Sequence, residues 1–188
     1  MGCGKQNAVL IIPCLGRTSD DVRSLMACVD KIKDADVVIV DDGSPVEIKG
    51  MNATILRSDI NLGPAAARNA GLAFVAKLHT PPTHVLLCDA DCVCTDAWVK
   101  TMVKALRKEK GAIVAGLTFA VRDTTIGTFH NRMGTLNPRV LSDGKDILYA
   151  PTCNMGFSLA TAKKFHPTLK LFDESFPTAA FEDVHFSI

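Results

Sequence analysis

Aromatic residues, long apolar runs and an excess of charge of either sign are scarce in this 188-residue sequence. Only 6% of the residues are aromatic, with one Trp and one Tyr, and 21 basic residues balance 20 acidic ones to a net charge of +1. A protein that binds nucleic acid through its phosphates usually carries a basic surface, so this balance predicts no nucleic-acid partner. No apolar stretch approaches the length of a membrane-spanning helix, and we expect no membrane span.

C-x-x-C pairs are also absent, although cysteine itself is not. An odd number of cysteines, most of them in apolar runs, is typical of reduced thiols and predicts a cytoplasmic protein. Without C-x-x-C pairs, the pattern favours buried structural thiols over a structural zinc site. The seven cysteines are Cys3, Cys14, Cys28, Cys88, Cys92, Cys94 and Cys153.

The sequence does contain short apolar runs that alternate with segments of helical periodicity. Strands are expected over residues 8–12, 37–40, 53–56, 85–88, 112–117 and 155–159. Helices are expected over 20–32, 65–78, 96–110 and 160–165, the first capped by Ser19 and the third by Thr95. This alternation predicts an α/β fold with a largely parallel sheet. Residues 122–150 show little periodicity, and we interpret them as a long loop with short elements that shapes a substrate site.

Acidic residues follow two of the expected strands. Asp41-Asp42-Gly43-Ser44 comes after the strand at 37–40, and Asp89-Ala90-Asp91 comes after the strand at 85–88. In an extended chain residues i and i+2 point the same way, so Asp89 and Asp91 could converge on one hard divalent cation. A polar turn after a strand would explain an isolated Asp-x-Asp equally well, and the motif alone does not decide between them.

A cation occupies an unusual place in the second expected helix. Pro64 is suited to the first helical position, and Arg68 lies in the early turns of the helix. The helix dipole favours anions at this end, so an arginine here could join free backbone N–H groups in receiving a phosphate. The alternative is an ordinary solvated arginine.

Five fragments together resemble the inverting family 2 glycosyltransferases with the GT-A fold. They occur in order as Ile11-Ile12-Pro13, Val40-Asp41-Asp42-Gly43-Ser44, Asn61-x-Gly63-x-x-x-Ala67-Arg68-Asn69-x-Gly71, Asp89-Ala90-Asp91 and Phe181-Glu182-Asp183. The resemblance implies a Rossmann-like, mostly parallel central sheet flanked by helices. It implies one nucleotide-sugar-binding domain over residues 1–188. Because the family continues with a helix after its Glu-Asp pair, we expect this domain to be truncated at its C-terminal end.

The resemblance also implies which residues bind the nucleotide of a sugar donor, expected to be a UDP-sugar. Asp42 would accept a hydrogen bond from the base, which Pro13 and Leu15 would border through their main chain. Arg68 would lie near the base or the diphosphate. The family usually has Tyr-Asn after the first proline, whereas this chain has Cys14-Leu15.

The remaining implied roles concern the metal and the chemistry. Asp89 would face the ribose and the metal, Ala90 would contact the donor, and Asp91 would bind Mn²⁺ or Mg²⁺. Asp183 would be the catalytic base that takes the proton of a carbohydrate or other hydroxyl acceptor, and we favour it over Glu182.

Two other functions compete with this interpretation. A sugar-nucleotide pyrophosphorylase has a related fold, but it would carry a glycine-rich loop where this chain has Leu15-Gly16-Arg17-Thr18. A catalytically silent nucleotide-sugar-binding domain would keep the donor residues and lack turnover. Near the far end of the chain, Cys153 and Asn154 could line the leaving-group side or could simply pack.

Overall fold

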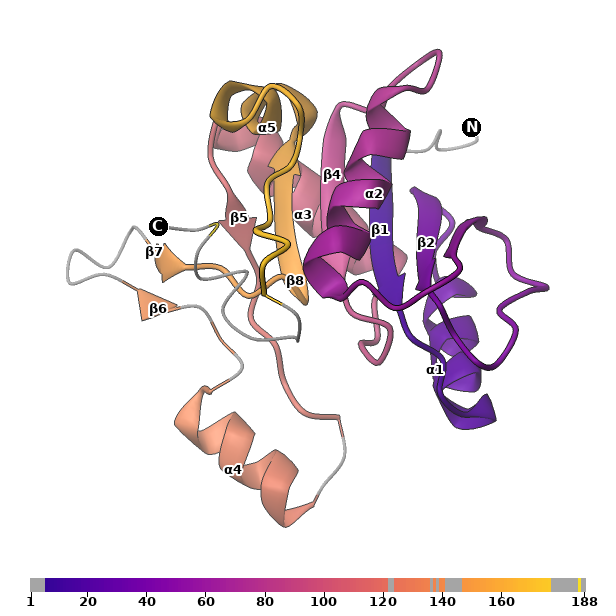
Figure 1. Cartoon of the computed structure of the whole chain (residues 1–188). Helices are drawn as coiled ribbons and strands as arrows, with labels where there is room; N and C mark the ends of the chain where they lie inside the picture. The colour runs from indigo at the N-terminus through magenta and orange to yellow at the C-terminus, as the bar shows by residue number, and fades with distance from the viewer. Residues whose placement is uncertain are drawn as a thin grey trace, which may run out of the picture.

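A six-stranded mixed sheet forms the centre of the molecule (Figure 1). The computed structural model describes residues 6–121, 124–135, 137, 139–140, 147–176 and 186. The strands lie in the order β3-β2-β1-β4-β8-β5. Their bounds are β1 Ala8–Cys14, β2 Asp36–Asp42, β3 Thr54–Ser58, β4 His84–Cys88, β5 Val114–Ala115 and β8 Asn154–Ser158. A small two-stranded sheet pairs β6 (Arg139–Val140) with β7 (Ile147–Tyr149).

The first four strands of the sheet run parallel. β1 pairs with β2 on one side and with β4 on the other, and β2 also pairs with β3. β8 then runs antiparallel to both β4 and β5. The expected α/β architecture with a mostly parallel central sheet is therefore confirmed, and the antiparallel β8 makes the sheet mixed.

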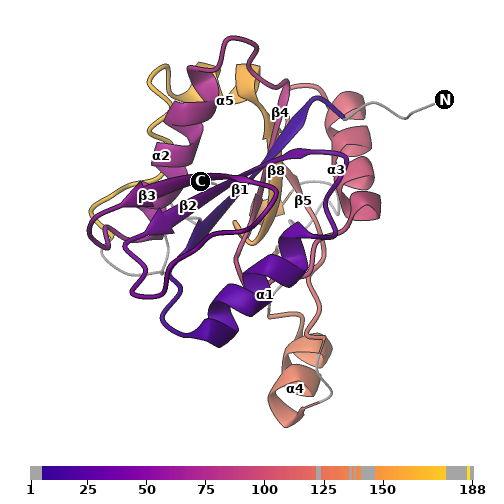
Figure 2. The ribbon, with the colours of Figure 1, turned by 90° about the vertical axis from the view of Figure 1, so that its right-hand side faces the viewer.

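Helices cover both faces of the sheet, as Figure 2 shows. α1 (Ser19–Val29) and α3 (Asp96–Lys108) pack on one face, while α2 (Pro64–Ala76) and α5 (Leu159–Phe165) pack on the other. Each face of the sheet has its own hydrophobic core, and alternate residues of β1 point into one or the other. Leu10 packs with α1 and α3, and Ile11 packs with α2. A strand buried on both faces must be apolar throughout, which explains why the strand runs in the sequence are continuous rather than alternating.

Several element boundaries differ from the sequence prediction. β1 continues through Pro13 to Cys14, because Pro13 lies beyond the last residue that pairs with β4 and needs to donate nothing there. Thr18, not Ser19, is the N-cap of α1. Its hydroxyl accepts from the Asp21 N–H, and the Asp21 carboxylate accepts from the Thr18 N–H, which completes a capping box.

The region expected to be mostly loop contains a nine-residue helix, α4 (Thr125–Met133). Gly134 ends it in a left-handed conformation. Ile126, Phe129 and Met133 recur along it at helical spacing, a periodicity that the sequence prediction missed. The strand expected over 112–117 shrinks to the two residues of β5. Among the described residues, no helix is both long and apolar enough to cross a bilayer.

Candidate functional site

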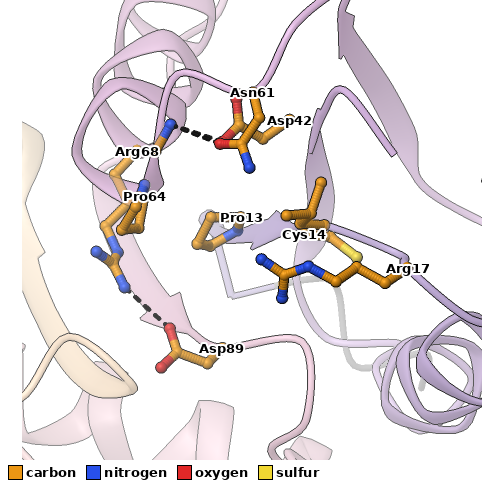
Figure 3. A pocket seen from close by; sticks show the side chains of 10 residues that line it. Pro13, Cys14, Arg17, Asp42, Asn61, Pro64, Arg68 and Asp89 are labelled. Atoms are coloured by element: carbon orange, nitrogen blue, oxygen red, sulfur yellow. Dashed lines mark hydrogen bonds and ion pairs between the residues drawn. The ribbon is translucent and has the colours of Figure 1, made fainter. Parts of the chain in front are cut away.

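A cavity of about 350 Å³ opens at the carboxyl ends of β1, β2 and β4, beside the first turn of α2 (Figure 3). α1 connects β1 to β2 across one face of the sheet, and α2 connects β3 to β4 across the other face, so the direction of the strand order changes between β1 and β4. Open α/β sheets bind their ligands at such a switch point. The lining residues are Pro13, Cys14, Leu15, Arg17, Asp42, Asn61, Gly63, Pro64, Arg68 and Asp89.

The two acids that end β2 have different environments. Asp41 is buried, pairs with Arg57 and accepts a hydrogen bond from the Ser44 N–H at 2.9 Å, so it holds the loop that follows. Asp42 lines the cavity, and its two oxygens accept from the N–H groups of Leu62 and Gly63, each at 2.8 Å. Each carboxylate oxygen keeps a second lone pair. Asp42 can therefore organise the turn before α2 and still accept from a ligand.

Gly43 and Ser44 join the loops around the cavity. The Ser44 hydroxyl accepts from the Gly16 N–H at 2.8 Å, which ties the loop after β2 to the loop after β1. Gly43 has φ +74°, and a Cβ there would lie 2.7 Å from the carbonyl carbon of Ile60. Both the backbone conformation and the close approach require glycine. The Asp-Asp-Gly-Ser fragment thus fixes the loop beside the cavity, and Asp42 is its member that lines the cavity.

Arg68 is buried, with 3% of its surface exposed, so it is not the solvated residue of the alternative interpretation. Its Nη2 forms an ion pair with Asp89 Oδ1 at 3.0 Å, as Figure 3 shows, and its guanidinium lies over the ring of Phe172 at 5.7 Å. Burial raises the pKa of the Asp89 carboxyl, and the nearby Arg68 charge opposes that rise. The pair places a fixed cation and an anion on the same side of the cavity.

Asp89 and Asp91 do not converge in the way predicted. β4 ends at Cys88, and residues 89–92 form a turn closed by a hydrogen bond from the Cys92 N–H to the Asp89 carbonyl at 3.1 Å. The extended-chain argument is therefore wrong, because the chain leaves the strand before the first acid. Asp89 lines the cavity, whereas Ala90 and Asp91 lie farther along the turn and Asp91 is exposed.

These two carboxylates nevertheless fit a hard cation by donor type. Mg²⁺ and similar ions are commonly held by one or two carboxylates together with phosphate oxygens and water, rather than by a complete protein cage. Partial removal of water raises the pKa of Asp91 as well as that of Asp89. Desolvated anions at a cavity mouth gain more from a cation than they would in bulk water.

Half of the lining residues were not predicted as site residues: Cys14, Arg17, Asn61, Gly63 and Pro64. Gly63 and Pro64 could have been found, since Pro at the first helical position marks the start of a helix, where the N–H groups of the following residues lack helical partners. Arg17 carried no signal, because only the bend after β1 brings it to the cavity.

Three other residues named in the sequence analysis do not line the cavity or lie outside the described residues. Asn154 is a packing residue: its Oδ1 accepts from Trp98 Nε1 at 2.9 Å, and its Nδ2 donates to the Leu117 carbonyl at 3.0 Å. Asp183 and Glu182 lie outside the described residues.

The family model described as "Glycosyl transferase family 2" matches residues 9–165. A crystal structure of GalNAc-T7 with UDP, GalNAc and Mn²⁺ aligns with a TM-score of 0.64 and 13% identity, over 96% of this chain and 39% of that one. The glucosyl-3-phosphoglycerate synthase from Mycobacterium tuberculosis, in complex with phosphoglyceric acid, aligns with a TM-score of 0.51 and 14% identity, over 81% and 57%. No curated protein matches.

This chain thus spans well under two thirds of either solved relative, and at these identities the likeness concerns the fold. The family match covers most of the sequence and includes β1, β2, α2 and β4, the elements that surround the cavity. The fold agrees with it independently. The chain belongs to glycosyltransferase family 2 and has the GT-A fold.

Proposed function

We propose that this domain transfers a sugar from a UDP-sugar to an acceptor hydroxyl, with inversion at the anomeric carbon and with the help of Mn²⁺ or Mg²⁺. The observation that carries the proposal is the cavity at the carboxyl ends of β1, β2 and β4. It brings Asp42, Arg68 and Asp89 together with the first turn of a helix. This combination offers an acceptor for a base, a cation for phosphate and a carboxylate for a ribose hydroxyl or a metal.

The nucleotide is bound by groups that the fold has already fixed. Pro13 and Leu15 border the base, and Asp42 accepts from its N–H. The diphosphate lies toward Arg68 and the first turn of α2, where Gly63 precedes Pro64 and the helix dipole favours an anion. Because Arg68 is buried and already paired, little ordering of its side chain is needed when the donor binds.

Asp91 and Asp89 are the residues that would hold the divalent cation, and Ala90 between them would contact the donor. The cation supplies Lewis-acid neutralisation of the charge that grows on the leaving nucleoside diphosphate. The carboxylates contribute the site's negative charge, and the exposed position of Asp91 keeps it accessible to an ion from solvent.

The acceptor is activated on the opposite face of the sugar. Asp183 takes the proton of the attacking hydroxyl while the new glycosidic bond forms and the bond to the diphosphate breaks. A single displacement of this kind inverts the anomeric centre. A positioned general base of this kind contributes ~10²–10⁴-fold to the rate.

The first test measures donor binding by thermal unfolding with UDP, with and without Mn²⁺. At about 100 times its dissociation constant, a ligand adds roughly 2.7 kcal/mol to the free energy of unfolding. Asp91→Ala should abolish the Mn²⁺-dependent part of that gain. Asp30→Ala removes an exposed acid at the end of α1 and should leave it unchanged. Equal gains in both variants would contradict the metal assignment.

The second test measures turnover of UDP-sugars, including transfer to water. Asp183→Ala should lower turnover by ~10²–10⁴-fold and keep UDP binding, whereas Glu182→Ala should have a smaller effect. Donor binding with no turnover in the unaltered chain would indicate a silent binding domain instead. Retained anomeric configuration in the product would refute the inverting mechanism.

A further inference from the structure

Three cysteines from separate parts of the chain meet behind the turn that carries Asp89 and Asp91. Cys28 lies on α1, Cys88 ends β4, and Cys94 directly precedes the N-cap of α3. Their Sγ atoms all lie within 4.8 Å of one another. Cys28 and Cys88 are fully buried and Cys94 is 5% exposed, so the sulfurs face one another in the core between the sheet and these two helices.

Ordinary packing does not account for this arrangement. The Sγ atoms of Cys88 and Cys94 are 2.7 Å apart, closer than the 3.5–4.0 Å at which apolar carbon atoms pack. One of the two thiols therefore donates a hydrogen bond to the other.

The donor set indicates which ion would fit. Thiolates select soft ions such as Cu(I) and Zn²⁺ and discriminate against Mg²⁺ and Mn²⁺, which prefer oxygen. With metal–sulfur bonds of about 2.3 Å, three sulfurs around one ion lie ~4.0 Å apart. The three Sγ atoms already lie within 4.8 Å of one another, and binding would move the Cys88 and Cys94 sulfurs apart from 2.7 Å. Structural Zn²⁺ is almost always four-coordinate. Among the described His, Cys, Asp and Glu residues this group has three members, and burial keeps water from supplying a fourth ligand.

We propose that Cys28, Cys88 and Cys94 form a three-thiolate site for a soft cation, with Cu(I) as the best match. The site differs in chemistry from the carboxylates of Asp89 and Asp91, which lie among the five residues between Cys88 and Cys94. An ion held there would cross-link α1, β4 and the start of α3, and would fix both ends of the turn that contains the two acids. The proposal does not depend on glycosyl transfer.

The test is a titration of the fully reduced chain with Cu(I) under anaerobic conditions, against a competing Cu(I) chelator. We expect one equivalent to bind, a thiolate-to-Cu(I) absorption band, three sulfur neighbours by X-ray absorption and a higher Tm. Cys28→Ala and Cys94→Ala should each weaken binding by more than about tenfold, a loss that removal of even an outer-shell partner can cause. Circular dichroism would confirm that both variants fold.

Two control variants keep the test specific. Cys14→Ala removes a buried thiol on β1 that is outside the group, and Cys153→Ala removes the thiol that neighbours Cys92. Both should bind Cu(I) within about twofold of the unaltered chain, since neither supplies a ligand. Loss of binding in Cys153→Ala or retained binding in Cys28→Ala would overturn the proposal.

Discussion

Two regions of the molecule differ in how far their apolar side chains are buried. The first runs from β1 to α3 (residues 8–108), and the second is the connection after β5 (residues 116–135). In the first region the strands and helices bury them in two cores on either side of the sheet. In the connection, six large apolar side chains are more than half exposed: Leu117, Phe119, Val121, Ile126, Phe129 and Met133. Burial stabilises a fold in proportion to the apolar area removed from water. The cavity is therefore built on the part of the molecule that buries its apolar side chains, whereas the described part of the connection adds little to stability.

The largest expected contrast comes from truncating one aliphatic side chain in each region. Leu72→Ala in α2 should lower the free energy of unfolding by about 2–5 kcal/mol, because it leaves a cavity in a fully buried core. Ile126→Ala in α4, where the side chain is 70% exposed, should change it by less than about 0.5 kcal/mol. Denaturant unfolding measures both, and a loss above about 2 kcal/mol for Ile126→Ala would show that the connection is packed after all.

Two glycines with similar backbone angles make the comparison sharper. Gly43 (φ +74°) and Gly134 (φ +62°) both adopt the left-handed conformation, which costs another residue about 1–2 kcal/mol. A Cβ at Gly43 would also meet the backbone of Ile60, while at Gly134 the nearest atom is 3.8 Å away. Gly43→Ala should cost about 1–3 kcal/mol more than Gly134→Ala and should weaken UDP binding. Equal costs would mean that the loop at Gly43 relaxes freely.

The side chain of Asn69 in α2 connects the first region to the segment around Phe172. Its amide donates to the Phe172 carbonyl at 2.8 Å and accepts from the Phe172 N–H at 3.1 Å, and it also donates to Glu174. Asn69→Ala should cost about 1–3 kcal/mol, because buried backbone groups lose their partners. Hydrogen exchange should accelerate near Phe172. The exposed Asn52→Ala is the control, and unchanged exchange in Asn69→Ala would refute the anchoring role.

The smallest expected effect is a response to pH that is confined to the donor site. The pKa values of Asp89 and Asp91 are raised above their ordinary 3.8. Protons should therefore compete with Mn²⁺ at a higher pH than for ordinary aspartates, and Mn²⁺-dependent UDP binding should weaken as the solution is acidified. The effect on folding has the opposite sign. The folded state holds these protons more tightly than the unfolded state, so the free energy of unfolding falls as pH rises from the unfolded pKa through the folded one.

Calorimetric titrations of UDP and Mn²⁺ across this range measure the binding effect. The described part of the connection carries no carboxylate and should contribute nothing to either trend. An acid midpoint for binding at or below that of an exposed aspartate would contradict the raised pKa values.

Half of the residues that line the cavity could be predicted from the sequence, chiefly because short motifs resemble those of one family and because two of the acids follow apolar strands. Pro13, Leu15, Asp42, Arg68 and Asp89 were predicted, and all five line the cavity. The prediction was weakest where a side chain reaches the site through a bend in the chain, as Arg17 does. It was also wrong about the path through Asp89 and Asp91, because a strand's end is decided by its hydrogen-bonded neighbour. The roles of Asp91 and Asp183 stay predictions.

By itself, the sequence determined the fold class and the acids that follow β2 and β4, since apolar periodicity and acids at strand ends are local properties of the chain. Tertiary structure decided how each acid is used. Asp41 and Asp42 are adjacent in sequence, yet one is held by Arg57 and Ser44 and the other faces the cavity. It also decided that Cys28 meets Cys88 and Cys94, because only the packing of α1 against the sheet brings together residues 60 positions apart. Such contacts depend on distance in space, which spacing along the chain does not specify.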